Sequence, residues 1–299
     1  MSVRLKDLPC EELFTGSLGC PGCGGVLAAR QALKVLGPDT VLVMPAGCVV
    51  TVSCYYPQIP FKVPMIVMAF AATGAAVSGV VAGLRRKGKQ HVNVVGFAGD
   101  GGTADIGLQS LSGAVERGEK FIYICYDNEA YMNTGVQRSS TTPFGAITNT
   151  TPGGVRRMFE ANARKKDVFR MLIAQGIPYA ATACVSYPQD YMRKVAKAMQ
   201  VNGPTYIHVL APCPPGWGFA ASDTVRLGRL AVESGIWQLL EWENGELHTT
   251  FRPGRRRPVA EYLRVQGRFR DLRDDDVAAI QARVDADASA PPDPLTRPR

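Results

Sequence analysis

The chain has 299 residues and a formal net charge of +8, so it can form one large α/β domain or two modest ones. Its apolar content of 46% and charged content of 20% are ordinary for a globular protein. Glycine, proline and charge interrupt every apolar run before the ~18 residues that a membrane span needs, and the N-terminus lacks the apolar stretch of a secretory signal. We therefore expect a cytoplasmic protein without a membrane span.

The excess of positive charge is a weak indication of nucleic-acid binding. Basic residues gather at 156–166 and at 255–257. Neither stretch interleaves aromatic with basic side chains, as a groove for single-stranded nucleic acid would. A solvated surface is the favoured interpretation, an acidic protein partner is the second, and nucleic acid is a distant third.

Taken in chain order, short apolar runs alternate with helical periodicity between about residues 26 and 210. The predicted strands are 41–45, 65–70, 93–99, 121–127, 179–185 and 205–213. The predicted helices are 26–37, 73–88, one after the glycine-rich turn that follows residue 99, then 167–175, 190–199, 224–233 and 259–272. This alternation is typical of a doubly wound, mostly parallel α/β sheet.

The extent of this alternating pattern divides the chain into three parts. Residues 1–25 form an N-terminal segment, 26–215 form the α/β domain, and 216–299 form an irregular C-terminal extension or arm. The last stretch, 286–299, resembles a disordered tail. Inside the domain, residues 128–154 are polar and without period, and a segment of that length in a compact domain is more often functional than idle.

A glycine-rich turn follows the strand predicted at 93–99. Gly99, Asp100 and Gly101 lie where this strand meets a helix, and α/β sheets bind ligands at the carboxyl ends of their strands. The spacing fits a dinucleotide fingerprint, but Asp100 argues against it, because a carboxylate is repelled by diphosphate unless a divalent cation bridges them. Asn128, at the end of the next strand, offers a second oxygen, so the pattern indicates Mg²⁺ and a diphosphate.

The chain has eight cysteines, which we do not expect to form structural disulfides in a cytosolic protein. Only Cys20 and Cys23 form a C-x-x-C pair, so a metal site needs ligands from distant parts of the chain. The pair alone does not distinguish zinc from an iron–sulfur cluster.

The segments GDGGTADIG (99–107) and YDNEAYMNTGVQRSSTTPFGA (126–146) resemble the thiamine-diphosphate motif of the pyruvate:ferredoxin oxidoreductase family. The resemblance extends over nearly the whole chain, from GCPGCGG near the N-terminus to YLRVQGRF near the C-terminus. It implies that Mg²⁺ is held by Asp100, Asn128 and the main-chain carbonyl of Ala130. It places Gly99, Gly101 and Gly102 beside the diphosphate.

The resemblance also assigns the cysteines. Four of them match the ligands of a [4Fe-4S] cluster: Cys20, Cys23, Cys48 and Cys213. Cys48 is in addition expected next to the cofactor. Asn133 is assigned a polar contact to substrate or intermediate, where a neutral amide stabilises developing negative charge; the alternative is a turn-forming asparagine beside glycine.

The function that the resemblance implies is that of the beta subunit of a 2-oxoacid:ferredoxin oxidoreductase. Such an enzyme decarboxylates a 2-oxoacid on thiamine diphosphate, passes electrons through the cluster to ferredoxin, and transfers the acyl group to coenzyme A. Pyruvate is the expected 2-oxoacid, with branched-chain 2-oxoacids or oxalate as alternatives. An alpha subunit is expected to complete the active site, with ferredoxin-like gamma and delta subunits in the assembly.

Two alternatives from other classes remain open. A non-oxidative thiamine lyase or synthase would use the region from Gly99 to Asn128 but has no need of four converging cysteines. A zinc-stabilised binding subunit would use the cysteines and leave the Mg²⁺-diphosphate motif without purpose.

Overall fold

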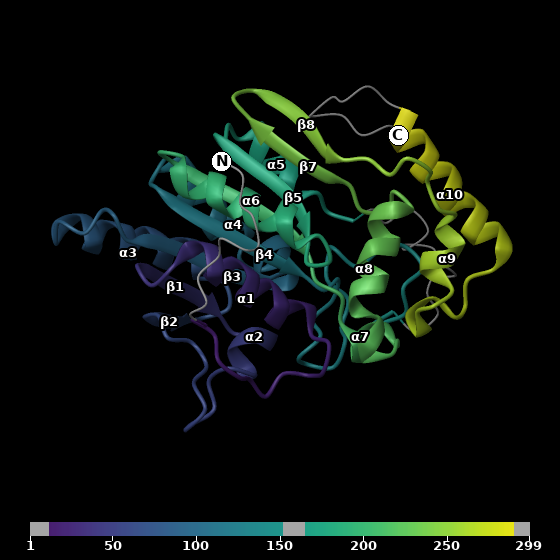
Figure 1. The fold of residues 1–299 in the computed structure, drawn as a ribbon, viewed down its shortest axis with the longest axis horizontal. Helices are drawn as coiled ribbons and strands as arrows, with labels where there is room; N and C mark the ends of the chain where they lie inside the picture. Colours follow the sequence, from purple (N-terminus) through teal and green to yellow (C-terminus); the bar gives the residue numbers. More distant parts are fainter. Residues whose placement is uncertain (1–11, 152–164, 290–299) are drawn as a thin grey trace.

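The structure is a computed structural model, and it describes residues 12–151 and 165–289. Its centre is an eight-stranded sheet in the order β2-β1-β3-β4-β6-β5-β7-β8 (Figure 1). The strands are β1 (Thr40–Pro45), β2 (Met65–Met68), β3 (Asn93–Gly99), β4 (Phe121–Asp127), β5 (Tyr179–Cys184), β6 (Pro204–Leu210), β7 (Leu239–Glu243) and β8 (Glu246–Phe251). The first six strands are parallel, whereas β7 and β8 run antiparallel to their neighbours.

The helices connect and cover these strands. They are α1 (Gly24–Leu36), α2 (Cys48–Thr51), α3 (Thr73–Arg86), α4 (Leu108–Glu116), α5 (Val168–Ala174), α6 (Pro188–Gln200), α7 (Pro214–Trp217), α8 (Thr224–Glu233), α9 (Val259–Leu263) and α10 (Asp274–Ser289). A π-helical turn, Gly101–Asp105, follows β3 directly. Among the described residues, no helix combines the length and the apolar character needed to cross a membrane.

Two hydrophobic cores lie on the two faces of the sheet. Helices α1 and α6 cover one face, and α3, α4 and α5 cover the other. Successive residues of β1 show the division, because Leu42 belongs to the first core and Val43 to the second, as expected for a strand buried on both faces. The predicted doubly wound, mostly parallel α/β fold is confirmed, and β4 spans the predicted residues.

The chain beyond residue 215 contains more regular structure than the irregular extension expected from the sequence. Strands β7 and β8 form a hairpin that adds to the sheet beside β5. Asn244 and Gly245, at its turn, have φ angles of 55° and 83°, which an Asn-Gly pair adopts readily. The sequence therefore contained a strong hairpin signal that the pattern analysis missed.

Helices α7 to α10 form a third hydrophobic cluster with one end of the sheet. Its buried side chains include Trp217, Leu227, Tyr262 and Val284. Figure 1 shows α8, α9 and α10 side by side at the C-terminal end of the molecule. The helix predicted over 259–272 is divided into α9 and a 3-10 turn, Gly267–Phe269, and α10 reaches into the stretch predicted as a tail.

Candidate active site

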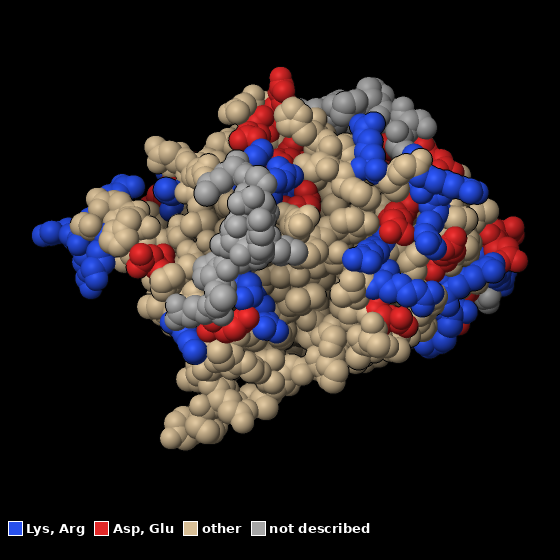
Figure 2. All heavy atoms as spheres, in the orientation of Figure 1, with Lys and Arg blue, Asp and Glu red and all other residues tan. Residues whose placement is uncertain are grey.

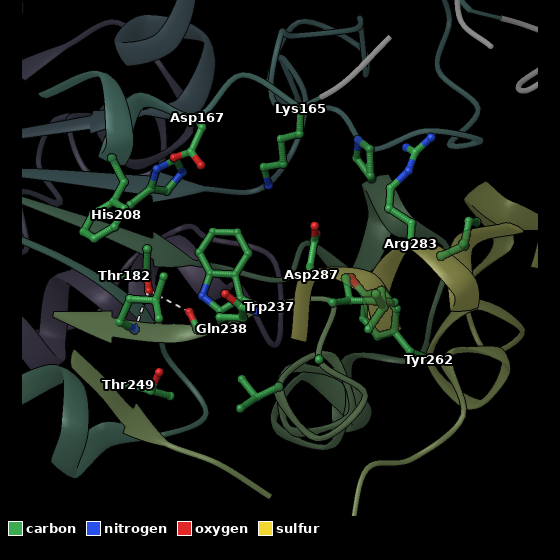
Figure 3. Close-up of a pocket in the computed structure, with 18 of the residues that line it drawn as sticks. Lys165, Asp167, Thr182, His208, Trp237, Gln238, Thr249, Tyr262, Arg283 and Asp287 are labelled. Atoms are coloured by element: carbon green, nitrogen blue, oxygen red, sulfur yellow. Dashed lines mark hydrogen bonds between the residues drawn. The ribbon is translucent and has the colours of Figure 1, made fainter. Parts of the chain in front are cut away.

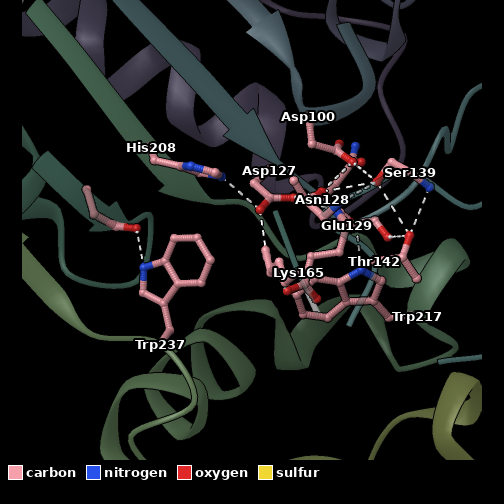
Figure 4. Close-up of polar contacts among 12 residues, drawn as sticks. Asp100, Asp127, Asn128, Glu129, Ser139, Thr142, Lys165, His208, Trp217 and Trp237 are labelled. Atoms are coloured by element: carbon pink, nitrogen blue, oxygen red, sulfur yellow. Dashed lines mark hydrogen bonds and ion pairs between the residues drawn. The ribbon is translucent and has the colours of Figure 1, made fainter. Parts of the chain in front are cut away.

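The predicted Mg²⁺ ligands lie at the carboxyl ends of two adjacent strands. Asp100 follows β3, Asn128 follows β4, and these strands are paired in parallel up to Gly99 and Tyr126. Asp100 and Asn128 are almost completely buried. Figure 4 shows their side chains pointing toward each other across the strand ends. The sheet thus brings together two residues that are 28 positions apart in the sequence.

Three oxygen atoms meet at this point without a donor between them. The side-chain oxygen of Asn128 faces the carbonyl oxygen of Ala130 at 2.8 Å and Oδ1 of Asp100 at 3.0 Å. Turning the amide over would let its nitrogen donate to both. The orientation with oxygen inward is repulsive unless a cation lies among the three atoms.

The separations among these oxygens fit magnesium. Mg²⁺ takes oxygen ligands at 2.0–2.1 Å in octahedral geometry, which puts neighbouring ligand oxygens about 2.9 Å apart. The distances from Asn128 to Ala130 and to Asp100 agree with this spacing. The amide oxygen is therefore the chemically sensible inward atom for a protein that binds Mg²⁺ here, and all three groups suit a hard cation.

Hydroxyl groups from the loop after β4 hold the other carboxylate oxygen of Asp100. Ser139 Oγ donates to Oδ2 at 2.5 Å, and Thr141 Oγ1 lies 2.9 Å from the same atom and 3.0 Å from Asp127 Oδ1. Burial raises the pKa of Asp100 well above its usual value, and the nearby Asp127 carboxylate raises it further. A divalent cation would offset both effects, since it favours the ionised carboxylate.

Asp127 is ionised by a different arrangement. Burial alone would raise its pKa, but the Lys165 ammonium and His208 outweigh burial and hold this pKa well below its usual value. Lys165 Nζ lies 2.6 Å from Asp127 Oδ2, and His208 Nε2 lies 2.9 Å from the same oxygen. The two carboxylates thus differ: Asp127 contacts the Lys165 ammonium and His208 directly, whereas Asp100, among the described residues, accepts hydrogen bonds from the Ser139 and Thr141 hydroxyls.

The glycines of the motif are not equivalent. A Cβ on Gly101 would overlap the ring of Tyr131, whose hydroxyl donates to Asp105 Oδ2 at 3.0 Å. A Cβ on Gly99 would meet the Tyr126 ring at 3.3 Å, and one on Gly102 would make only ordinary contacts. Packing therefore demands glycine at 101, while the roles predicted for Gly99 and Gly102 at the diphosphate stay predictions.

The four predicted cluster cysteines lie in one neighbourhood. Burial, followed by the Cys213 and Cys23 thiols, raises the pKa of Cys48 to about 12. Burial raises the pKa of Cys213 to about 11, with smaller contributions from Cys23 and Cys20. Within residues 12–151 and 165–289, however, no three cysteine, histidine or acidic side chains are close enough to hold a single metal ion.

Backbone amides face three of these sulfurs. Those of Gly25 and Val26 act on Cys23, that of Asn133 on Cys48 and that of Gly216 on Cys213, and each lowers the thiol pKa against the effect of burial. Free N–H groups aimed at sulfur are the means by which proteins stabilise and tune thiolate-bound clusters.

Close packing explains how Cys23 and Cys213 come together. The backbone N–H of Gly24 donates to the Pro212 carbonyl at 3.0 Å, and a Cβ on Gly24 would lie 2.5 Å from the Ala211 backbone. The start of α1 therefore lies directly on the segment that precedes Cys213.

Asn133 lies in an exposed part of the loop after β4. Its backbone amide faces Cys48, and the Asn128 side-chain amide is 3.9 Å from the Cys48 sulfur. Asn133 is thus beside both the oxygen site and the cysteines. Its contact to substrate stays a prediction.

Sequence reasoning missed several residues of this site. Trp217 Nε1 donates to the main-chain carbonyl of Asn128 at 2.7 Å, and Arg268 forms an ion pair with Glu129 at 2.7 Å. Lys165 joins Asp127 to Glu129. Trp217 could have been suspected because it follows Cys213 closely, but nothing in the sequence pattern singles out Arg268 or Lys165.

A cavity of about 440 Å³ lies behind this arrangement, between the sheet, the β7–β8 hairpin and α10. Glu129, Lys165 and His208 belong to its lining, as do Trp237, Tyr262 and Arg283. Figure 3 shows the Lys165 side chain pointing into it and Arg283 on the opposite side. Glu129, which lies between Asn128 and Ala130 in the chain, therefore borders this cavity.

Comparisons with known proteins agree with this geometry. Residues 46–209 match the family model of the thiamine pyrophosphate enzyme C-terminal TPP binding domain. The pyruvate synthase subunit PorB of Methanothermobacter marburgensis is 54% identical over 93% of this chain and 97% of that protein. The ketoisovalerate oxidoreductase subunit VorB of Pyrococcus horikoshii is 46% identical over 93% of this chain and 91% of that protein.

A solved structure supports the fold. The 2-oxoglutarate:ferredoxin oxidoreductase from Magnetococcus marinus superposes with a TM-score of 0.55 at 20% identity, over 93% of this chain and 96% of that chain. The chain therefore belongs to the beta subunits of the pyruvate synthases and other 2-oxoacid:ferredoxin oxidoreductases, which are multi-subunit enzymes, and it contains their thiamine-diphosphate-binding domain.

Proposed function

We propose that this chain is the subunit that binds Mg²⁺-thiamine diphosphate and a [4Fe-4S] cluster in an enzyme that oxidatively decarboxylates pyruvate. The observation that carries the proposal is the convergence of the Asp100 carboxylate, the Asn128 side-chain amide and the Ala130 carbonyl at the strand ends, with 2.8 and 3.0 Å between the Asn128 amide and the other two groups. Pyruvate is favoured because the pyruvate synthase relatives from Methanothermobacter marburgensis and Methanocaldococcus jannaschii are 54% and 50% identical. Identity alone does not separate the substrates, since the pyruvate synthase relative from Methanosarcina barkeri and the ketoisovalerate oxidoreductase relative are both 46% identical.

The residues of this chain divide the work at the cofactor. Asp100, Asn128 and the Ala130 carbonyl hold Mg²⁺, with Gly99, Gly101 and Gly102 alongside the diphosphate. Thiamine diphosphate, when bound, supplies the electron sink for decarboxylation. Asn133 offers a neutral amide to the negative charge that develops on the substrate.

Two observations favour a cluster over zinc at the cysteines. Thiolates around one zinc ion lie about 3.8 Å apart, given Zn–S bonds of about 2.3 Å in a tetrahedron, and the described residues contain no such group. Thiolates around a cube of iron and sulfide lie farther apart, and Cys20, Cys23, Cys48 and Cys213 are near enough to one another to affect each other's pKa values. The backbone amides that face three of the sulfurs suit the same cofactor.

Exposed apolar side chains fit the proposed alpha subunit. Between residues 12 and 106, seven large apolar side chains are more than a third exposed: Leu18, Tyr55, Tyr56, Ile59, Ile66, Val67 and Ile106. Figure 2 shows an uncharged projection at the lower edge of the molecule, which Figure 1 identifies as the segment between α2 and β2. Strand β2 is also one of the two edge strands of the described sheet. Apolar patches of this kind mark protein interfaces.

The rest of the assembly follows from the family. Gamma and ferredoxin-like delta subunits would conduct electrons to ferredoxin, and coenzyme A would accept the acyl group. We place the assembly in the cytoplasm, where thiols stay reduced.

Anaerobic purification of the complex tests this function. We expect iron and acid-labile sulfide in a 1:1 ratio, bound thiamine diphosphate, and viologen reduction with coenzyme A that is faster with pyruvate than with 2-oxoisovalerate or 2-oxoglutarate. Colourless protein with stoichiometric zinc would refute the cluster. Faster turnover of 2-oxoisovalerate would correct the substrate.

The isolated chain should be inactive even when it is loaded with cluster, Mg²⁺ and thiamine diphosphate. Thiamine enzymes need a glutamate from a second, similar domain, and the described residues form only one such sheet. Adding the alpha subunit should restore pyruvate-dependent dye reduction. Full turnover by this chain alone would show that the half-site interpretation is wrong.

A further inference from the structure

We propose that Arg268 and Trp217, both from beyond the α/β domain, are positioning residues that hold the turn Asn128–Ala130 in the geometry that Mg²⁺ requires. The proposal rests on the Mg²⁺ site of the proposed function. The two residues contact the turn at its centre and at its first carbonyl.

The residue at the centre of the turn has an unfavourable backbone. Glu129 has φ 67°, in the left-handed region that glycine adopts most easily. The turn nevertheless has a side chain at this position, buried to 4% exposure. Glycine would adopt this backbone conformation at a lower conformational cost. Because the position holds a buried glutamate instead, we infer that the Glu129 carboxylate makes contacts that the turn needs.

Two cations hold the Glu129 carboxylate. Lys165 Nζ lies 2.7 Å from Oε1, and Arg268 Nη2 lies 2.7 Å from Oε2. Glu129 also borders the cavity of about 440 Å³, and these two ion pairs hold its carboxylate there. Arg268 is therefore one of two anchors for the centre of the turn.

Arg268 is itself held rigidly, and its support leads back to the turn. Its guanidinium stacks 3.7 Å from the Trp217 ring centroid, and Nε donates to Gln266 Oε1 at 2.8 Å. Trp217 Nε1 in turn donates to the Asn128 carbonyl at 2.7 Å (Figure 4). Trp217 thus holds the main chain of Asn128, and Arg268 holds the side chain of Glu129, which lies between the proposed ligands Asn128 and Ala130.

This arrangement matters more for Mg²⁺ than for a larger cation. Mg²⁺ demands near-ideal octahedral geometry, whereas Ca²⁺ accepts flexible geometry and longer bonds. Loosening the turn should therefore weaken Mg²⁺ binding more than Ca²⁺ binding. A residue that only stabilises the fold would lower the melting temperature without changing the ratio of the two affinities.

The experiment uses the whole complex, stripped of metal and thiamine diphosphate. The variants are Arg268→Gln, which removes the ion pair, and Trp217→Phe, which keeps the ring and removes the donor. Arg270→Gln is the matched control, because Arg270 is exposed and belongs to the same short segment. Calorimetric titration with Mg²⁺ and with Ca²⁺, at saturating thiamine diphosphate, gives the two affinities for each variant.

We expect Arg268→Gln to weaken Mg²⁺ binding by roughly 10- to 100-fold, as for other residues that orient metal ligands. Ca²⁺ binding should change less, and excess Mg²⁺ should restore cofactor binding. Trp217→Phe should shift the same ratio in the same direction, and Arg270→Gln should match wild type. Unchanged Mg²⁺/Ca²⁺ ratios in both variants would overturn the proposal, and Trp217→Phe decides alone if Arg268→Gln does not fold.

A fourth variant, Asp100→Ala, separates the two proposals: if it retains Mg²⁺ binding, the proposed metal site itself is wrong.

Discussion

Two buried ionic networks lie beside the same sheet. They differ in whether their carboxylate, amide and carbonyl oxygens face hydrogen-bond donors or face one another. The first surrounds the strand ends at Asp100 and Asp127. The second lies between α6, β5 and β7 and centres on Glu241. Both bury several charges, so burial of charge by itself does not distinguish a functional site from a structural one.

Every contact of the second network pairs a donor with an acceptor. Glu241 Oε2 accepts from Arg193 at 3.0 Å, and Oε1 lies 2.5 Å from Lys197 Nζ and 3.2 Å from the Tyr179 hydroxyl. Although burial would raise the pKa of Glu241, these cations lower it below its usual value. Among the described residues, both carboxylate oxygens of Glu241 have partners, and the ion pairs tie α6 to the β7 strand.

The first network has a surplus of oxygens on one side. Lys165, His208 and Arg268 serve Asp127 and Glu129, but Asp100, Asn128 and Ala130 turn oxygens toward one another. We infer that this convergence of oxygens, rather than the number of charges, marks the proposed cofactor site.

The largest effect is expected for Asp100→Ala. Removing the carboxylate leaves two neutral oxygens, which cannot hold Mg²⁺ against water. Calorimetry should detect no Mg²⁺-dependent binding of thiamine diphosphate, while the melting temperature stays the same or rises, because a buried carboxylate with a raised pKa is removed. Wild-type affinity in this variant would show that Asp100 is not a ligand.

Asn133→Ala should lower turnover by roughly 10²-fold with little change in cofactor affinity, as for other donors to developing negative charge. Asn133 lies in the exposed loop beside Cys48 and adds no ligand to the metal site. Steady-state kinetics of the complex and a cofactor titration measure the two quantities. Turnover within a factor of two of wild type would assign Asn133 to the turn alone.

Glu241→Gln should have the opposite pattern. Removing the negative charge leaves Arg193 and Lys197 without their main partner, and since both cations are partly exposed we expect a loss of about 2 kcal/mol of unfolding free energy. Urea unfolding of the chain gives this value. Mg²⁺ affinity should match wild type, and a parallel loss of cofactor binding would show that the two networks are coupled.

The sequence could predict that the proposed ligands of the first network lie together, but it could not predict the residues that support them. Asp100 and Asn128 end two strands whose apolar runs are unambiguous, so parallel pairing had to bring them together. Lys165 and Arg268 follow no motif, because their role depends on how distant segments pack. Cys213 was assigned by resemblance, since only the fold brings it beside Cys23.

The C-terminal elements show a different cause of error. The Asn244-Gly245 turn and the acidic start of α10 at Asp274 are local signals that could have been used. Helix α7 could not have been predicted, because its residues, Pro-Pro-Gly-Trp, disfavour a helix, and it is stabilised by packing. Local sequence signals thus account for the β7–β8 hairpin and α10, whereas α7 depends on tertiary contacts.

The smallest effect concerns Lys194, which lies beside the second network and contacts Asp190 Oδ2 at 2.5 Å and the Thr182 carbonyl at 2.8 Å. It is completely buried, and burial lowers its pKa from 10.5 to about 8. Because the folded state has the lower pKa, the unfolded chain binds more protons between about pH 8 and pH 10.5. This residue's contribution to stability is therefore present above pH 10.5 and is lost as the pH falls through 8.

A Lys194→Met variant keeps a long side chain and removes this titration. Between pH 8.5 and 9.5, Lys194 should add a slope of about 1 kcal/mol per pH unit to the unfolding free energy, close to the limit for one proton. Subtracting the urea-unfolding curve of the variant from that of wild type cancels the titration of the tyrosines and other groups that both chains share. A difference that does not change with pH would show that Lys194 titrates near its ordinary pKa and that Asp190 compensates its burial in full. A difference with the expected slope, together with unchanged Mg²⁺ affinity, would assign this buried cation to the fold alone.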